Sequence, residues 1–205
     1  MRIIDCEQRS PEWYAARLGV PTASEFGRII TDKKMEYAAG AATYINELID
    51  EVYRPDAERG FSGNRHTERG NLLEDEARDL YAIEADVIPQ KVGFILSDNG
   101  MLGCSPDSLV GTNGGLEIKA PDGPKHIEWL RAGGLPLEHR AQVHGSIIIT
   151  GRAWWDFISY CPGYPRILIR VTPDDYTDKL RSCLARFTDD YAKARQSFAT
   201  LLKAA

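Results

Sequence analysis

The middle of the chain changes from helical to β-type patterning, and this change limits the folds that the sequence can adopt. Short β-type runs occupy 87–96 and 116–120, and tight turns at Asp98-Asn99-Gly100 and Asn113-Gly114-Gly115 interrupt them. Apolar residues at helical spacing lie on both sides of this segment. The order is therefore helices, a strand meander, helices, two strands and a helix. This order predicts one mixed α/β (α+β) domain over residues 1–205.

The expected helices are marked by capping residues or by the spacing of apolar side chains. Ser10-Pro11 begins the first, and Thr22 followed by Glu25 predicts a capping box at the start of a second. The same signals predict helices over about 35–53, 67–84, 126–132, 138–150 and 173–202, and strands over about 154–161 and 166–172. A loop is expected around 60–64.

The composition fits a globular protein and argues against several other classes. Hydrophobic residues make up 43% of the chain, and no apolar run approaches the ~20 residues that span a bilayer. The N-terminus lacks the apolar core of a signal peptide, so we expect a cytoplasmic protein. The four cysteines form no CxxC pair, which argues against a zinc site or a disulfide framework. The net charge of −5 argues against a protein that coats DNA by overall charge, although a local basic groove remains compatible with it.

Two carboxylates and an amine stand close together in the meander. Asp107 precedes a turn, and Glu117 and Lys119 follow it on one face of a strand, with Ile118 on the other face. A hairpin would bring Asp107 close to Glu117. Magnesium takes one or two carboxylates and keeps several waters, so Asp107, Glu117 and the main-chain carbonyl of Ile118 form a candidate half-shell. Lys119 would orient the attacking water or stabilise developing negative charge.

A structural interpretation of the same residues stays open at this point. Asp107 would then be a turn residue, and Glu117 and Lys119 a surface pair, because such short patterns often occur by accident. The apolar setting of the strand Leu-Glu-Ile-Lys-Ala favours the functional interpretation.

Several motifs in a fixed order resemble one known family. Ser105-Pro106-Asp107 with Glu117-Ile118-Lys119 looks like the PD-(D/E)xK nuclease signature. The chain resembles, more narrowly, the phage lambda exonuclease family of viral recombinases and alkaline exonucleases. The further segments that carry this resemblance are Trp13 with the run from Arg17 to Glu25, the run from Gly70 to Ala77, Cys104 to Asp107, and Ala141-Gln142-Val143-His144. Together they span about residues 10 to 160.

The resemblance implies a fold, an activity and partners. The fold would be a restriction-endonuclease-like core, a central twisted mixed sheet flanked by helices. The activity would be Mg²⁺-dependent hydrolysis of the 5′-phosphorylated strand of double-stranded DNA from 5′ to 3′, with two Mg²⁺ ions and with Mn²⁺ as a substitute. Mononucleotides would be released, and the remaining 3′ strand would serve single-strand-annealing recombination. The implied partners are DNA ends, a ring-shaped homotrimer and a single-strand annealing protein, in a bacterial or phage-infected cell.

The resemblance also implies roles for individual residues. Asp107, Glu117 and the Ile118 carbonyl would bind metal, and Glu74 would serve the second ion directly or through water. Gln142 would hydrogen-bond near the attacking water or the scissile phosphate. Phosphate recognition involves more residues. Arg17, Ser24 and Ser105 would hold the terminal 5′-phosphate, and Arg65, Arg69, Lys125 and Arg131 would contact other DNA phosphates.

Two alternative functions remain compatible with the sequence. One is a PD-(D/E)xK endonuclease of restriction or repair type, which would not need the phosphate pocket. The other is a non-catalytic module that binds DNA ends, which the intact Asp107, Glu117 and Lys119 oppose.

Overall fold

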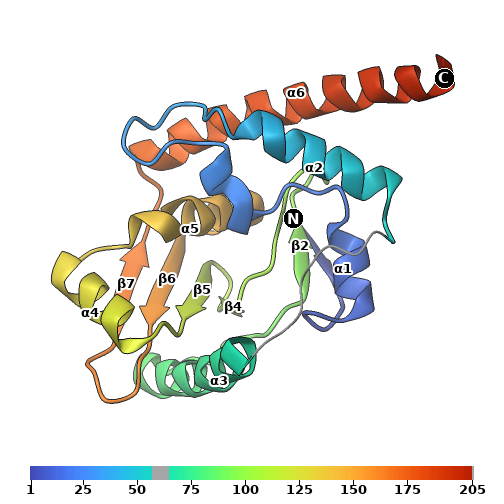
Figure 1. Cartoon of the computed structure of the whole chain (residues 1–205). Coiled ribbons are helices and arrows are strands. Elements are labelled where there is room, and N and C mark those ends of the chain that lie inside the picture. The colour runs from blue at the N-terminus through green and yellow to red at the C-terminus, as the bar shows by residue number, and fades with distance from the viewer. Residues whose placement is uncertain (57–64, 205) are drawn as a thin grey trace.

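A computed structural model describes residues 1–56 and 65–204 and places a four-stranded mixed sheet at its centre (Figure 1). The strand order is β4-β5-β6-β7. β5 pairs with β6 in parallel, whereas β4–β5 and β6–β7 are antiparallel. The strands are Ser108–Val110 (β4), Gly114–Lys119 (β5), Trp154–Ser159 (β6) and Ile167–Val171 (β7). The predicted mixed sheet, including the β4–β5 hairpin, is confirmed.

A second sheet has three short antiparallel strands in the order β1-β2-β3. These strands are Arg2–Ile4 (β1), Phe94–Leu96 (β2) and Gly103–Cys104 (β3). From β3 the chain runs directly through residues 105–107 into β4. Thr22 forms a parallel bridge with Gly103, so the segment that contains Arg17 and Ser24 lies beside the strand that leads to Ser105.

Helices cover both faces of the four-stranded sheet. α3 lies on one side, and α5 lies on the other side with α6 and α2 beyond it (Figure 1). The helices are Pro11–Arg17 (α1), the 3₁₀ helix Ala23–Arg28 (η1), Ala41–Tyr53 (α2), Arg65–Ala85 (α3), Gly123–Ala132 (α4), Leu137–Thr150 (α5) and Asp175–Ala204 (α6). The predicted sheet flanked by helices is therefore confirmed.

Because side chains alternate along the central strands, they contribute to two apolar cores, one on each face of the sheet. Leu116 and Ile118 on β5 pack with Ala77 and Tyr81 of α3 in the smaller core. Side chains of the opposite parity face α5 and join the larger core, which includes Phe26, Leu109, Val143, Trp155, Phe157 and Phe187. Because helices cover both sheet faces, Glu117 of β5 is buried and Lys119 is partly buried.

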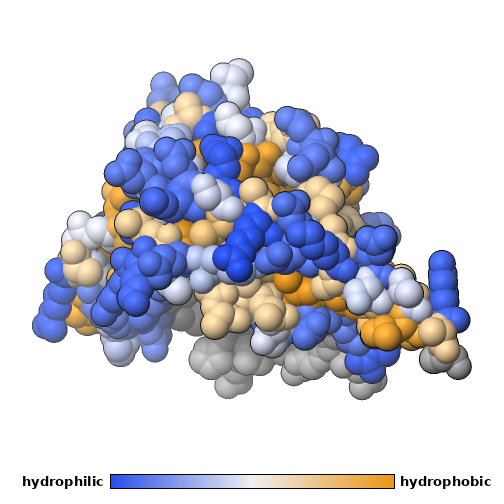
Figure 2. All heavy atoms as spheres, turned by 90° about the horizontal axis from the view of Figure 1, so that it is seen from above, coloured by the Kyte–Doolittle hydropathy of each residue, from blue (hydrophilic) through white to orange (hydrophobic). Residues whose placement is uncertain are grey.

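The surface over α2 and α6 is mostly hydrophilic, with small apolar patches between the charged side chains (Figure 2). Within the described ranges, no helix combines the length and the apolar character that crossing a membrane requires. All four cysteines are free, as their scattered positions predict.

Two sequence-based predictions need correction, and one segment cannot be compared. The capping box at Thr22 is wrong, because the Thr22 hydroxyl contacts Arg17 and Ser24 and so serves a tertiary cluster. The helix expected from about residue 35 begins only at Ala41. Met35 adopts a positive φ of 54° within a turn closed by hydrogen bonds between Thr31 and Glu36, which a helix could not accommodate. The loop expected around 60–64 lies outside the described residues.

Candidate active site

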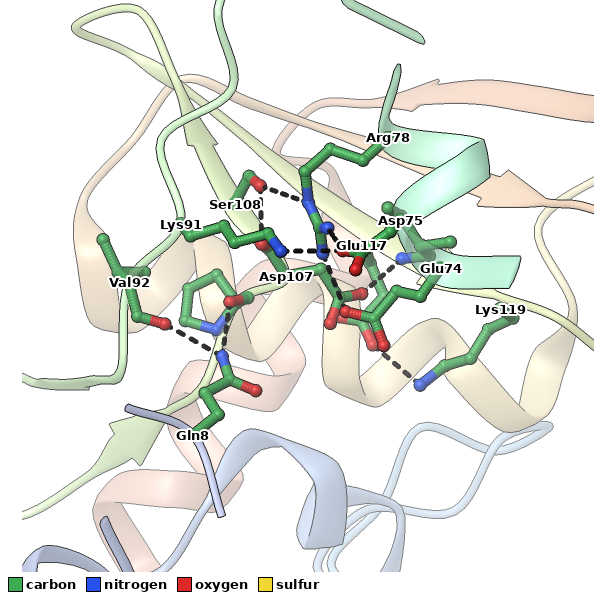
Figure 3. Close-up of polar contacts among 12 residues, drawn as sticks. Gln8, Glu74, Asp75, Arg78, Lys91, Val92, Asp107, Ser108, Glu117 and Lys119 are labelled. Atoms are coloured by element: carbon green, nitrogen blue, oxygen red, sulfur yellow. Dashed lines mark hydrogen bonds and ion pairs between the residues drawn. The ribbon is translucent and has the colours of Figure 1, made fainter. Parts of the chain in front are cut away.

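The β4–β5 hairpin brings the predicted carboxylates and the amine together (Figure 3). Asp107 Oδ2 accepts a hydrogen bond from the backbone N–H of Ile118 at 2.5 Å. Glu117 Oε1 lies 2.7 Å from Lys119 Nζ and accepts a hydrogen bond of 2.6 Å from Gln142 Nε2 on α5. Glu117 is only 2% exposed, so the surface-pair interpretation of Glu117 and Lys119 is wrong.

The strand pairing is interrupted where Asp107 enters the site. Ser108 pairs with Leu116, and the same register would place Pro106 opposite Ile118. Opposite residues at such a position exchange two N–H···O bonds, but proline has no N–H to donate. The Asp107 carboxylate takes the Ile118 N–H, and β4 offers no N–H to the Ile118 carbonyl on the same edge. Without an N–H partner from β4, that carbonyl would be available to a ligand from outside the sheet.

The buried charges of this centre strongly influence one another. Burial raises the pKa of Asp107 well above its usual value, and the charges of Glu117 and Glu74 raise it further. Burial also raises the pKa of Glu117, partly offset by Lys119. Burial alone would lower the pKa of Lys119, but Glu117 and Asp107 outweigh it and raise that pKa. The Lys119 ammonium thus stays charged, and the carboxylates around it favour an additional cation.

Glu74 carries a third carboxylate toward this pair from α3. Its helix stripe with Ala77 and Tyr81 faces the sheet, as the sequence predicts, since both of those side chains are buried. Glu74 raises the pKa of Asp107 and of Glu117, which places its charge near theirs. A cavity of about 300 Å³ is lined by Glu74, Asp107, Arg78 and Gln8, among others.

The donor set fits a hard cation of the magnesium type. Magnesium needs one or two carboxylates and completes its shell with water and substrate oxygens. Asp107, Glu117 and the Ile118 carbonyl would supply that set, and the crowded negative charge of the two carboxylates favours a divalent ion. Among the described residues, no group of three or more Asp, Glu, His or Cys side chains converges on one point as a ready cation cage. Glu74 therefore stands beside the Asp107–Glu117 pair rather than in a single three-carboxylate cluster.

The residues expected to hold a terminal phosphate form a second cluster. Arg17 donates from its NH1 group to Ser105 Oγ at 3.1 Å and from its NH2 group to Thr22 Oγ1 at 3.4 Å. Thr22 Oγ1 lies 3.2 Å from Ser24 Oγ, so Ser24 joins the cluster through Thr22. Trp13 donates from Nε1 to Ser105 Oγ at 2.9 Å, and the Arg17 guanidinium stacks 4.2 Å from the Trp13 ring centre.

Arg17 is a partly buried cation held by hydroxyl groups. Burial lowers its pKa from the usual value, although the more distant charges of Tyr44 and Glu51 partly counter this effect. Within the described part of the chain, no carboxylate pairs with Arg17 at 4.0 Å or less. Arg17 and Thr22 also line a cavity of about 850 Å³. An anion in this cavity would give the guanidinium the countercharge that its hydroxyl partners do not provide.

Two of the four basic residues predicted to contact DNA have described side chains, and both lie on α4. Lys125, near the start of α4, forms ion pairs with Glu128 at 3.3 Å and Glu138 at 3.1 Å. Arg131 is exposed in the last turn of α4. The side chains of Arg65 and Arg69, at the start of α3, lie outside the described part of the structure. A phosphate-binding role of these four residues stays a prediction.

Several polar residues of the two clusters were not assigned a role from sequence. Arg78 contacts Glu74 at 2.8 Å and Ser108 at 3.1 Å, and its position one helical turn after Glu74 was an available signal. Trp13 and Thr22 lie in a segment that carries the family resemblance, but no local pattern predicts their contacts with Ser105 and Arg17. Gln8 donates to the carbonyl oxygens of Val92 and Pro106 at 2.9 and 2.8 Å, and no local pattern marks it.

Comparison with known proteins places this geometry in a family. The YqaJ-like viral recombinase domain matches residues 12–153, which is more than half of the chain. Two crystal structures of the alkaline exonuclease LHK-Exo, from Laribacter hongkongensis, are similar over nearly the whole chain. The structure in complex with dAMP is 32% identical, with a TM-score of 0.82, covering 96% of this chain and 100% of that one. The other is 33% identical, with a TM-score of 0.74, covering 94% and 100%.

More distant likeness extends to the fold alone. A phage-related exonuclease from Haemophilus somnus 129PT is 14% identical, with a TM-score of 0.67, covering 89% of this chain and 96% of that chain. Among curated proteins, no sequence matches this chain. The family match and the two structures with about a third of their residues identical agree with the PD-(D/E)xK geometry described above. The chain therefore belongs to the YqaJ-like viral recombinase family and is similar to the alkaline exonuclease LHK-Exo.

Proposed function

We propose that this nuclease hydrolyses the 5′-phosphorylated strand of a double-stranded DNA end from 5′ to 3′, with Mg²⁺ as its cofactor. Asp107, Glu117 and the Ile118 carbonyl would hold one ion, and Glu74 would serve a second ion directly or through water. Mn²⁺ would substitute for Mg²⁺. The products would be mononucleotides and a 3′ single strand that is suited to single-strand-annealing recombination.

The observation that carries this proposal is the position of the partly buried Arg17 beside Ser105. Ser105 accepts hydrogen bonds from both Arg17 and Trp13, and it lies two residues before Asp107. A terminal phosphate bound to Arg17 would therefore lie close to the carboxylate centre. An enzyme that starts at a 5′-phosphate requires an anion site near its metal ligands, and Arg17 beside Ser105 supplies a candidate for it.

Different residues of the chain would have different roles in the hydrolysis. A divalent cation at Asp107 and Glu117 would supply Lewis-acid charge to the phosphate and make the attacking water more acidic. Lys119, whose raised pKa keeps it protonated, would orient that water or stabilise the negative charge that develops on the phosphate. Gln142 holds Glu117 by its side-chain N–H and would fix the direction of that carboxylate. Arg17, Ser24 and Ser105 would place the terminal phosphate, which sets the distance to the scissile bond.

The assembly and its setting extend the proposal. A ring-shaped homotrimer around the DNA would need a basic inner face only, which is compatible with a net charge of −5. Arg65, Arg69, Lys125 and Arg131 would contact DNA phosphates, and a single-strand annealing protein would take up the exposed 3′ strand. We place the enzyme in the cytoplasm of a bacterial or phage-infected cell.

One digestion experiment tests the proposal against its two alternatives. Three duplexes of the same sequence would be compared: linear with 5′-phosphates, linear with 5′-hydroxyls, and covalently closed circular. Acid-soluble nucleotide would be measured with Mg²⁺ and with a chelator. We expect fast release from the 5′-phosphorylated ends, slow release from the 5′-hydroxyl ends, no cleavage of the circle and no activity without metal.

The alternatives predict different results. Equal cleavage of all three duplexes would support an endonuclease of restriction or repair type. Binding to DNA ends without release of nucleotide in Mg²⁺ would support a non-catalytic module. Lys119→Met, which removes the ammonium but keeps a similar side-chain length, is the matched inactive control.

A further inference from the structure

Arg78 is a buried arginine on α3 that the proposed reaction does not yet use. It is only 6% exposed and lies one helical turn after Glu74. Burying a guanidinium is costly unless acceptors satisfy its N–H groups, so a buried arginine indicates a specific arrangement of partners. Figure 3 shows Arg78 between Glu74, Asp75 and Ser108.

The partners of Arg78 belong to two different elements. On its own helix, NH2 donates to Glu74 Oε1 at 2.8 Å and NH1 donates to Asp75 Oδ1. Across the interface, Nε donates to Ser108 Oγ on β4 at 3.1 Å. The Ser108 hydroxyl in turn donates to the carbonyl oxygen of Asp107 at 2.5 Å. A continuous chain of polar contacts thus joins Glu74, through Arg78 and Ser108, to the backbone of Asp107.

Glu74 depends on this chain for its position. The side chain of Glu74 is 25% exposed, whereas Glu117 is almost fully buried and is held by Lys119 and Gln142. A partly exposed glutamate without a fixed partner samples several rotamers. Arg78 binds one oxygen of Glu74, Oε1, and so restricts the rotation of this carboxylate.

We propose that Arg78 is a positioning residue, which fixes the Glu74 carboxylate beside Asp107 so that Glu74 can serve the second metal ion. This inference rests on the proposed function, because it assumes a divalent ion at the carboxylate centre. Arg78 itself contacts neither ion nor substrate. Partners that orient metal ligands in this way typically contribute 10- to 100-fold to metal affinity or activity.

Metal binding to the DNA-free protein separates this role from a general effect on activity. Mn²⁺ binding would be measured by calorimetry and by electron paramagnetic resonance for wild type, Arg78→Met and Arg78→Lys. We expect Arg78→Met to weaken the weaker class of Mn²⁺ site about 10- to 100-fold and to leave the tighter class near its wild-type affinity. Arg78→Lys keeps the charge but lacks the planar fork that spans helix and strand, so we expect an intermediate loss.

Lys91→Met is the matched control variant. Lys91 is 64% exposed at its side chain and forms an ion pair of 2.7 Å with Asp75, on the outer side of the same network. Its removal deletes one cation near the site but leaves the Glu74–Arg78–Ser108 contacts in place. We expect wild-type Mn²⁺ binding from Lys91→Met, and a loss equal to that of Arg78→Met would overturn the inference.

A double variant tests whether Arg78 acts through Glu74. If it does, Arg78→Met combined with Glu74→Gln should weaken Mn²⁺ binding no more than Glu74→Gln alone. Additive losses, or wild-type binding by Arg78→Met, would refute the positioning role. If Arg78→Met does not fold, as judged by its thermal transition, Arg78→Lys carries the same comparison. A wild-type protein that neither binds Mn²⁺ nor degrades DNA would instead refute the proposed function itself.

Discussion

Replacing Arg17 by alanine tests the link between the anion pocket and the choice of DNA end. Arg17 makes two side-chain hydrogen bonds in the free protein, one from each terminal nitrogen. With DNA bound, both nitrogens would donate to the terminal phosphate. A hydrogen bond to a charged group contributes about 1.5–3 kcal/mol, and each 1.4 kcal/mol corresponds to a factor of ten. Losing two such bonds therefore reduces the contribution of the phosphate by about 100-fold or more.

The assay compares kcat/KM on duplexes with 5′-phosphate and 5′-hydroxyl ends. The ratio of the two values isolates the phosphate, because a general loss of activity affects both substrates alike. We expect the ratio to fall toward one in Arg17→Ala. Arg17→Lys keeps the charge but loses one of the two directed bonds, so it should retain part of the preference.

Arg28→Ala is the matched control for Arg17→Ala. Arg28 lines the same cavity and lies 4.7 Å from the Tyr44 ring centre, but it already forms an ion pair of 2.6 Å with Glu47. Its charge is thus compensated, and the preference for 5′-phosphate should survive its removal. An unchanged ratio in Arg17→Ala, or an equal collapse in Arg28→Ala, would contradict the reasoning.

Three further predictions concern the centre and the packing around it. Asp107→Asn and Lys119→Ala should each abolish nucleotide release while circular dichroism shows an intact fold, and substantial turnover in either would show that the centre is misassigned. Because burial raises the pKa of Asp107 and Glu117 in the folded state, the folded protein holds their protons longer than the unfolded chain. Without metal, the free energy of unfolding should therefore fall as the pH rises from the unfolded pKa values, near 3.8 and 4.5, to the raised folded pKa values. Mg²⁺ should restore the lost stability. A melting temperature that rises with pH over this range would contradict the prediction. Gly145→Val would place a Cβ 2.5 Å from the Phe26 ring, so the free energy of unfolding should fall by about 1–3 kcal/mol. Thermal melting measures this loss, and Gly27→Ala is the control because a Cβ at position 27 meets no other atom within 4 Å.

The carboxylate centre was predictable from the sequence because its parts are local. Asp107, Glu117 and Lys119 lie within one hairpin, and the alternation of a strand determines which of them share a face. The turn signal at Asn113-Gly114-Gly115 predicted the hairpin, although the turn lies at residues 111–113 and the strand already begins at Gly114. Local periodicity was therefore sufficient for this part of the site.

Contacts between distant segments were not predictable in the same way. Gln8 binds carbonyl oxygens 84 and 98 residues away, and a three-residue strand such as β1 is too short to show alternation. Thr22 shows how tertiary structure overrides a local signal: its sequence context is typical of a helix cap, but its hydroxyl contacts Arg17 and Ser24. The anion pocket was assigned from the family resemblance, since no spacing rule joins Arg17 to Ser105 across 88 residues.

Pro106 has a consequence for how substitutions at this edge of the sheet should be judged. Any other residue at position 106 would carry an amide hydrogen, and the ladder between β4 and β5 could extend by one more rung. The Ile118 carbonyl would then accept a hydrogen bond from residue 106. The sheet would become more regular, but this oxygen would be less able to bind a cation. A substitution of Pro106 that strengthens the β4–β5 pairing would thus weaken metal binding, because both interactions need the same carbonyl oxygen.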